Sequence, residues 1–161
     1  AMKKYILIAS VLAFIYADPV FYFSPGIQIG VNSTGNFFFS SQITIGAIPF
    51  EETGIILGTT FGRRYYYNGG KFDSYGYLDG QVCLAGILGL GIGTMNRTTS
   101  TTYYDNSGIL QQEIIKEKYT KYKFWAGAIG LLSYDFINSP SGQHNFGLMG
   151  VIPVPFGEIN P

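Results

Sequence analysis

Hydrophobic and polar residues alternate with a period of two along most of the chain from residue 20 onward. In residues 21–31 every odd position is apolar, from Phe21 to Val31, whereas the even positions carry Tyr, Ser, Gly and Gln. Successive side chains of a β-strand point to opposite faces, so this segment is predicted to be a strand with one apolar face and one small or polar face. The same alternation recurs in seven further segments, which are 37–47, 55–64, 72–84, 88–93, 121–128, 134–136 and 143–156.

Residues that favour tight turns separate the predicted strands. Asn, Asp, Ser, Pro and Gly are concentrated at four connections, which are 32–35, 68–70, 105–108 and 138–142. These are alternate connections, so we expect them together at one end of the sheet, with both termini at the other end. The pattern predicts an all-β fold, an eight-stranded antiparallel up-and-down barrel, because closure into a ring leaves no sheet edge unpaired.

Composition indicates which face of this barrel points outward. Only 12% of the residues are charged, about half of the roughly 25% found in soluble domains. A soluble barrel would show its small polar face to water with almost no charge, which is unusual for a soluble surface. We therefore expect the apolar face to contact membrane lipid and the polar face to fill a narrow interior. The ten basic and ten acidic residues balance, which gives no electrostatic basis for nucleic-acid binding.

The first residues are typical of a secretory signal peptide. Lys3 and Lys4 precede a largely apolar run at 5–17, and Asp18 and Pro19 follow it. The run is shorter than the roughly 20 residues that a membrane-spanning helix needs. Because an alanine stands before the first methionine, as after cloning, residues 1–17 are interpreted as one cloning residue plus a signal peptide. Residues 18–161 are then expected to form a single barrel domain.

The leader, the alternation, the eight predicted strands and a final run ending at Phe156 together resemble the small outer-membrane β-barrels of the OmpA and OmpX type. The resemblance covers residues 20–156 and rests on this pattern. It implies a location in the bacterial outer membrane and a non-enzymatic role in surface presentation, adhesion or envelope structure. The chain departs from such proteins in one respect, since they often end on the aromatic residue, whereas residues 157–161 follow it here.

Two other classes of function stay open at this stage. One is a lipid-modifying barrel enzyme, because small barrels that resemble the deacylases carry a His-x-Ser pair. Here the single histidine, His144, is followed two residues later by Phe146, although Ser139 and Ser141 lie in the adjacent turn. The other class is a soluble, lipocalin-like carrier with the two faces reversed. No metal or cofactor is expected, because one His and one Cys supply too few ligands.

Charged residues with the inward parity form the first candidate site, a lumen charge network. Its members are Arg64, Arg97, Asp73, Asp79, Lys121 and Asp135. An ion without a partner is costly in a dry interior. We therefore predict that Arg64 and Arg97 make buried pairs with carboxylates drawn from these aspartates, which would close the barrel to ions. Lys123 has the same inward parity, but Lys123 and Asp73 are expected nearer the solvated rim.

The second candidate site is a long hairpin between the fifth and sixth strands. A membrane-spanning strand needs about 9–11 residues, yet these strands can run over 87–104 and 109–127. A helix at 111–118 is the alternative, since its residues have good helix propensity, but it would leave the Thr-rich segment 98–102 without a partner. The open edges of a hairpin at 97–123 can accept a strand from another protein. The candidate partner-binding residues are Thr99, Tyr103, Tyr104, Ile114, Lys116, Lys118 and Tyr119.

Overall fold

The computed structural model of the protein describes residues 20–50, 53–127 and 130–156. The predicted signal peptide at 1–17 lies outside these ranges. Within them the strands are β1 (Val20–Asn32), β2 (Phe37–Phe50), β3 (Ile55–Asn68), β4 (Lys71–Leu84), β5 (Leu88–Tyr104), β6 (Leu110–Ala126), β7 (Leu131–Asn138), β8 (Gln143–Val151) and β9 (Val154–Phe156). A search of the same ranges finds no helix with the length and apolar character to cross a membrane.

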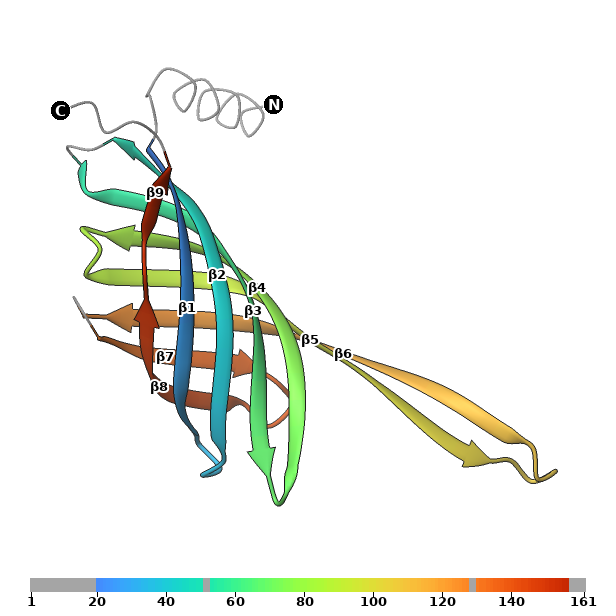
Figure 1. The fold of residues 1–161 in the computed structure, drawn as a ribbon. Helices are drawn as coiled ribbons and strands as arrows, with labels where there is room; N and C mark the ends of the chain where they lie inside the picture. The colour runs from blue at the N-terminus through green and yellow to red at the C-terminus, as the bar shows by residue number, and fades with distance from the viewer. Residues whose placement is uncertain (1–19, 51–52, 128–129, 157–161) are drawn as a thin grey trace, which may run out of the picture.

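The strands close into an antiparallel ring of eight (Figure 1). Each of β1 to β7 pairs with the next strand along the chain, and β8 pairs back with β1 from Gly26↔Val151 to Asn32↔Asn145. The predicted eight-stranded up-and-down barrel is therefore confirmed. At the predicted turns, Gly35, Gly70 and Gly108 adopt φ values of 84°, 93° and 73°, which only glycine reaches without strain.

The last predicted strand, 143–156, is divided in two. β8 ends at Val151 and β9 begins at Val154, where it continues the pairing with β1 as far as Phe21↔Phe156. Pro153 lies in the break, and a proline has no N–H to donate to the neighbouring strand. The prediction of one continuous strand is wrong at this point, although both pieces stay on the same side of β1.

Inward glycines face inward aromatic side chains on neighbouring strands. Four directly opposed pairs have this form, namely Gly30 with Phe38, Gly46 with Tyr22, Gly62 with Tyr77 and Gly89 with Trp125. A Cβ at these glycines would lie 2.7, 2.5, 2.2 and 2.1 Å, respectively, from an atom of the opposing ring. Carbon atoms pack best at about 3.5–4.0 Å. Glycine is therefore required for each ring to lie across the neighbouring strand and fill the narrow interior.

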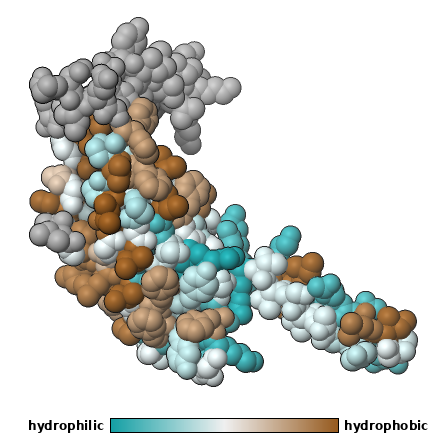
Figure 2. Space-filling view, viewed as in Figure 1, coloured by the Kyte–Doolittle hydropathy of each residue, from teal (hydrophilic) through white to brown (hydrophobic). Residues whose placement is uncertain are grey.

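The interior is layered along the barrel axis. One buried apolar cluster, which includes Phe38, Tyr66 and Met95, lies toward the tight turns, and a second, which includes Trp125 and Met149, lies toward the opposite end. Charged and amide side chains fill the space between them. The outer face carries the apolar set, including Ile27, Ile43, Leu90 and Leu148, which are 56%, 43%, 65% and 55% exposed. Figure 2 shows apolar residues over much of the barrel and more polar residues along much of the projecting hairpin.

Candidate functional site

Arg64 and Asp135 form the centre of the lumen charge network. Both side chains are fully buried, and Arg64 Nη2 lies 2.5 Å from Asp135 Oδ2. The guanidinium also donates to Ser40 Oγ at 2.8 Å and to Gln28 Oε1 at 2.7 Å, and it lies 4.3 Å from the centroid of the Phe38 ring. A buried ion is stable only when such a set of partners replaces its hydration. The ion pair predicted for Arg64 is present.

Lys121 joins a second carboxylate to this network. Its Nζ donates to Asp79 Oδ2 at 2.6 Å and lies 3.9 Å from Asp135 Oδ1, with all three side chains fully buried. The ammonium also lies 3.8 Å from the centroid of the Tyr77 ring, a favourable position for a desolvated cation. Asp79 therefore pairs with a lysine rather than with either arginine. The network links β3, β4, β6 and β7 across the lumen.

Arg97 pairs with Asp73 outside this closed interior. The distance between Arg97 Nη2 and Asp73 Oδ1 is 2.6 Å, and Arg97 Nη1 donates to the Tyr75 hydroxyl at 3.2 Å. The predicted pairing of Arg97 with one of the aspartates is present, but the two charged side chains are 26% and 32% exposed, so the prediction that this pair is buried is wrong. The reason is the register, because Asn96 is the last residue of β5 that pairs with β4. Arg97 instead braces the base of the hairpin against β4.

Lys123 is buried, in contrast to the prediction of a solvated position at the rim. Its side chain is directed inward opposite Gly91, and only 3% of the residue is exposed. Nζ lies 3.3 Å from Gln42 Oε1 and 3.5 Å from Met149 Sδ. In the described part of the chain no carboxylate lies within 4.0 Å of it. Alternation gives Lys123 the same inward parity as Lys121, so its direction was predicted correctly and only its depth was wrong.

The hairpin of β5 and β6 continues well past the ring. Its outer part pairs from Arg97↔Glu117 to Tyr104↔Leu110, whereas the neighbouring strands β4 and β7 pair only as far as Asn96 and Thr120. Within the described residues, both edges of this outer part are therefore without a third strand. The segment 111–118 lies in β6, so the strand prediction is confirmed and the helix alternative is excluded.

The turn at the end of the hairpin is held by Asp105. Its Oδ1 accepts hydrogen bonds from the backbone N–H groups of Ser107 at 2.8 Å and Ile109 at 2.9 Å. These N–H groups of Ile109 and Ser107 stabilise the carboxylate and lower the pKa of Asp105 below its usual value. The turn therefore presents the two strand ends in one defined arrangement.

The candidate partner-binding residues divide between the two faces of the hairpin. Directly opposed residues share a face, so Thr99, Tyr103 and Tyr119 lie on the face that continues the barrel interior. Tyr104, Ile114, Lys116 and Lys118 lie on the other face. Tyr104 and Leu110 at the tip are 73% and 60% exposed, and Ile114, which lies opposite Ser100 about halfway along the outer part, is 60% exposed. Figure 2 shows apolar residues at the far end of the hairpin and a second apolar patch along its otherwise more polar stem.

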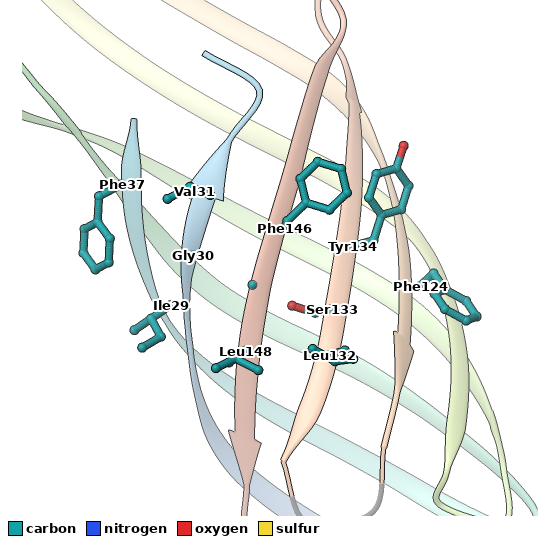
Figure 3. Close-up of a pocket in the computed structure, with 11 residues that line it drawn as sticks. Ile29, Gly30, Val31, Phe37, Phe124, Leu132, Ser133, Tyr134, Phe146 and Leu148 are labelled. Atoms are coloured by element: carbon teal, nitrogen blue, oxygen red, sulfur yellow. The ribbon is translucent and has the colours of Figure 1, made fainter. Parts of the chain in front are cut away.

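An apolar groove of about 670 Å³ lies on the outside of the barrel, across β1, β7 and β8 (Figure 3). Its floor includes Gly30 and Gly147, which are directly opposed on β1 and β8. Aromatic side chains stand along it, among them Phe37, Phe124 and Phe146. The groove therefore belongs to the same outward apolar surface as the exposed aliphatic residues.

His144 lies on this outer surface beside two aromatic rings. Its Nδ1 is 2.7 Å from the Tyr134 hydroxyl, and its ring packs against the rings of Tyr134 and Phe136. Ser139 and Ser141, which the enzyme alternative requires, line a separate cavity at the turn end of the barrel. The histidine is thus held by a tyrosine, in a setting typical of a surface aromatic cluster.

No protein-family model and no curated protein matches the chain.

Proposed function

We propose that this protein is a bacterial outer-membrane β-barrel that spans the membrane with β1 to β8 and presents the β5–β6 hairpin at the cell surface as an adhesive element. One observation carries the proposal, namely that the apolar side chains of a closed ring point outward while its buried charged side chains, which are Arg64, Asp79, Lys121, Lys123 and Asp135, point inward. Arg63 of β3 is an exception, since it is exposed. A contiguous apolar surface of this kind would be unfavourable in water. It is the arrangement that lipid requires, since closure satisfies every backbone group within the sheet.

The strand lengths agree with a membrane-spanning role. β1 has 13 residues, which at about 3.3 Å per residue and a tilt of about 40° reach roughly 33 Å along the barrel axis. The apolar band of outer-membrane barrels is about 25 Å tall. A soluble carrier, by contrast, needs an apolar interior and a polar exterior, which is the reverse of the distribution here. The buried charge network and the aromatic rings also fill the middle of the lumen, which favours a closed barrel over a pore.

Membrane insertion is tested by folding the purified chain from denaturant into phosphatidylcholine vesicles. We expect the folded protein to migrate differently on electrophoresis before and after boiling, as a closed barrel does. Protease added outside the vesicles should cut within 97–119 and leave the remaining strands protected. A folded protein that stays in solution without lipid or detergent would contradict the proposal.

The adhesive role follows from the shape of the hairpin. Its eight outer pairs, Arg97↔Glu117 to Tyr104↔Leu110, extend roughly 26 Å at about 3.3 Å per residue. Unpaired edges offer backbone donors and acceptors to an incoming strand. The exposed apolar residues at the tip, including Tyr104 and Leu110, would add side-chain contacts. Because long loops of outer-membrane barrels lie on the outer side, the hairpin would point away from the cell.

A shortened hairpin tests this role. Thr98 and Lys116 are directly opposed, so replacing residues 99–115 by Asn-Gly joins the two strands through a favourable two-residue turn. We expect this variant to fold and insert like the wild type. Bacteria that display it should lose attachment to protein-coated surfaces and to one another. Equal attachment of wild type and variant would contradict an adhesive hairpin, and a variant that fails to fold would show that the hairpin is part of the barrel's stability.

A further inference from the structure

A cavity of about 440 Å³ lies inside the barrel at the end opposite the tight turns. This is within the range of about 300–1,000 Å³ that small-molecule sites occupy. Much of its lining is aliphatic, including Ile48, Ile56, Leu131 and Val151. A hydrocarbon chain would pack well against these aliphatic side chains, while Tyr22, Ser24, Thr44 and Gln81 add polar groups elsewhere on the same walls.

One residue of the cavity wall carries a buried donor without an acceptor. Trp125 lines the cavity and is 7% exposed, and among the described residues its Nε1 has no hydrogen-bond partner. Buried tryptophan N–H groups ordinarily have one. The indole lies directly over Gly89, because a Cβ there would be only 2.4 Å from Nε1. Gly89 therefore makes room for the Trp125 ring, although the Nε1 donor of that ring has no acceptor.

An excess positive charge lies two residues from Trp125, on the same face of β6. The buried ionisable residues comprise three cations, Arg64, Lys121 and Lys123, and two carboxylates, Asp79 and Asp135. Of the cations, Lys123 is the one outside the ion pairs of the described residues. Its Nζ contacts Gln42 and Met149, both of which line the cavity. An anion in the cavity would offset a charge that is otherwise costly to bury.

We infer that this cavity binds a carboxylate with a short hydrocarbon chain. The carboxylate would accept a hydrogen bond from Trp125 Nε1 and lie close to the Lys123 ammonium. The chain would occupy the space between the aliphatic side chains nearer the end of the barrel, such as Ile56 and Val151. This ligand combines the two chemical requirements of the site, an acceptor with negative charge and an apolar body. The inference concerns the lumen and is independent of what the hairpin binds.

Trp125 supplies the measurement, because it is the only tryptophan in the chain. With the protein folded in phosphatidylcholine vesicles, we expect octanoate to change its fluorescence in a saturable manner. Octanol and octylamine, which partition into lipid but carry no negative charge, should bind at least about tenfold more weakly, the factor expected for a charge-assisted hydrogen bond. Equal binding of octanol and octanoate, or no saturable change, would overturn the inference.

Two further measurements connect the binding to this cavity. Lys123→Met should weaken octanoate binding about tenfold and leave octanol unchanged, whereas Lys116→Met, the same change on the exposed hairpin, should alter neither. Cys83, the single cysteine, lines the cavity, so octanoate should slow its reaction with a small thiol reagent. This protection assay uses the wild-type chain and so decides the question even if Lys123→Met does not fold. Unchanged labelling of Cys83 at saturating octanoate would place the ligand elsewhere.

Discussion

Replacing Gly62 by alanine is expected to destabilise the barrel, because the new methyl group would collide with Tyr77. A Cβ at position 62 would lie 2.2 Å from Tyr77 Cζ and 2.3 Å from its hydroxyl oxygen. The ring is held in place, since the hydroxyl donates to Gln42 Oε1 at 3.0 Å and Lys121 Nζ lies 3.8 Å from the ring centroid. Restoring an ordinary contact of about 3.5 Å therefore requires a ring shift of more than about 1 Å.

The magnitude follows from the interactions that this shift disturbs. Overpacking of a filled core typically costs about 1–3 kcal/mol, and a lost hydrogen bond from Tyr77 adds about 1 kcal/mol. We expect Gly62→Ala to lower the free energy of unfolding by about 2–4 kcal/mol. The measurement is a reversible guanidinium titration of the protein in phospholipid vesicles, followed by the fluorescence of Trp125.

Gly76→Ala provides the matched control on the adjacent strand. Gly76 lies opposite Arg63 and Asn96, and a Cβ there would meet no atom within 4 Å. This substitution should change the free energy of unfolding by less than about 1 kcal/mol, in the stabilising direction, because alanine loses less backbone entropy than glycine on folding. If the two variants were equally stable, the role of the glycine–aromatic pairs in filling the lumen would be refuted.

Three further predictions concern the charges and the outer surface. Asp135→Asn leaves the buried Arg64 without its carboxylate and should cost about 3–5 kcal/mol in the same titration; a smaller loss than for Gly62→Ala would contradict the central place of this ion pair. Leu90→Arg should cost about 2–4 kcal/mol if Leu90 faces the middle of the membrane, so wild-type stability in vesicles would oppose the lipid-facing proposal. Because the pKa of Asp105 is lowered in the folded hairpin, its stabilisation of the turn is complete above the ordinary aspartate pKa and is lost as the pH falls through the lowered value. The amide resonance of Ser107 should shift over that acidic interval, and a resonance that moved at neutral pH instead would contradict the assignment.

Local patterns in the sequence determined the strands, the turns and the hairpin. A strand places successive side chains on opposite faces, so the parity of residues such as Ile27, Leu90 and Lys121 could be read without knowing which strands are neighbours. The strand at 111–118 was also predictable, because the Thr-rich segment 98–102 required a partner of equal length. These features depend on neighbours in the chain or on residues across a single turn.

Only the tertiary structure decided which inward groups meet. Arg64 and Asp135 are 71 positions apart, and Lys123 lies 81 positions from Gln42, so their contacts depend on the register of several strands around the ring. Parity gave the same inward direction to Arg97 and Lys123, yet the first lies at the rim and the second is buried. The depth of Arg97 depends on the residue at which β4 and β5 cease to pair, and that of Lys123 on how the ring closes. Both depend on the register of every strand pair around the barrel.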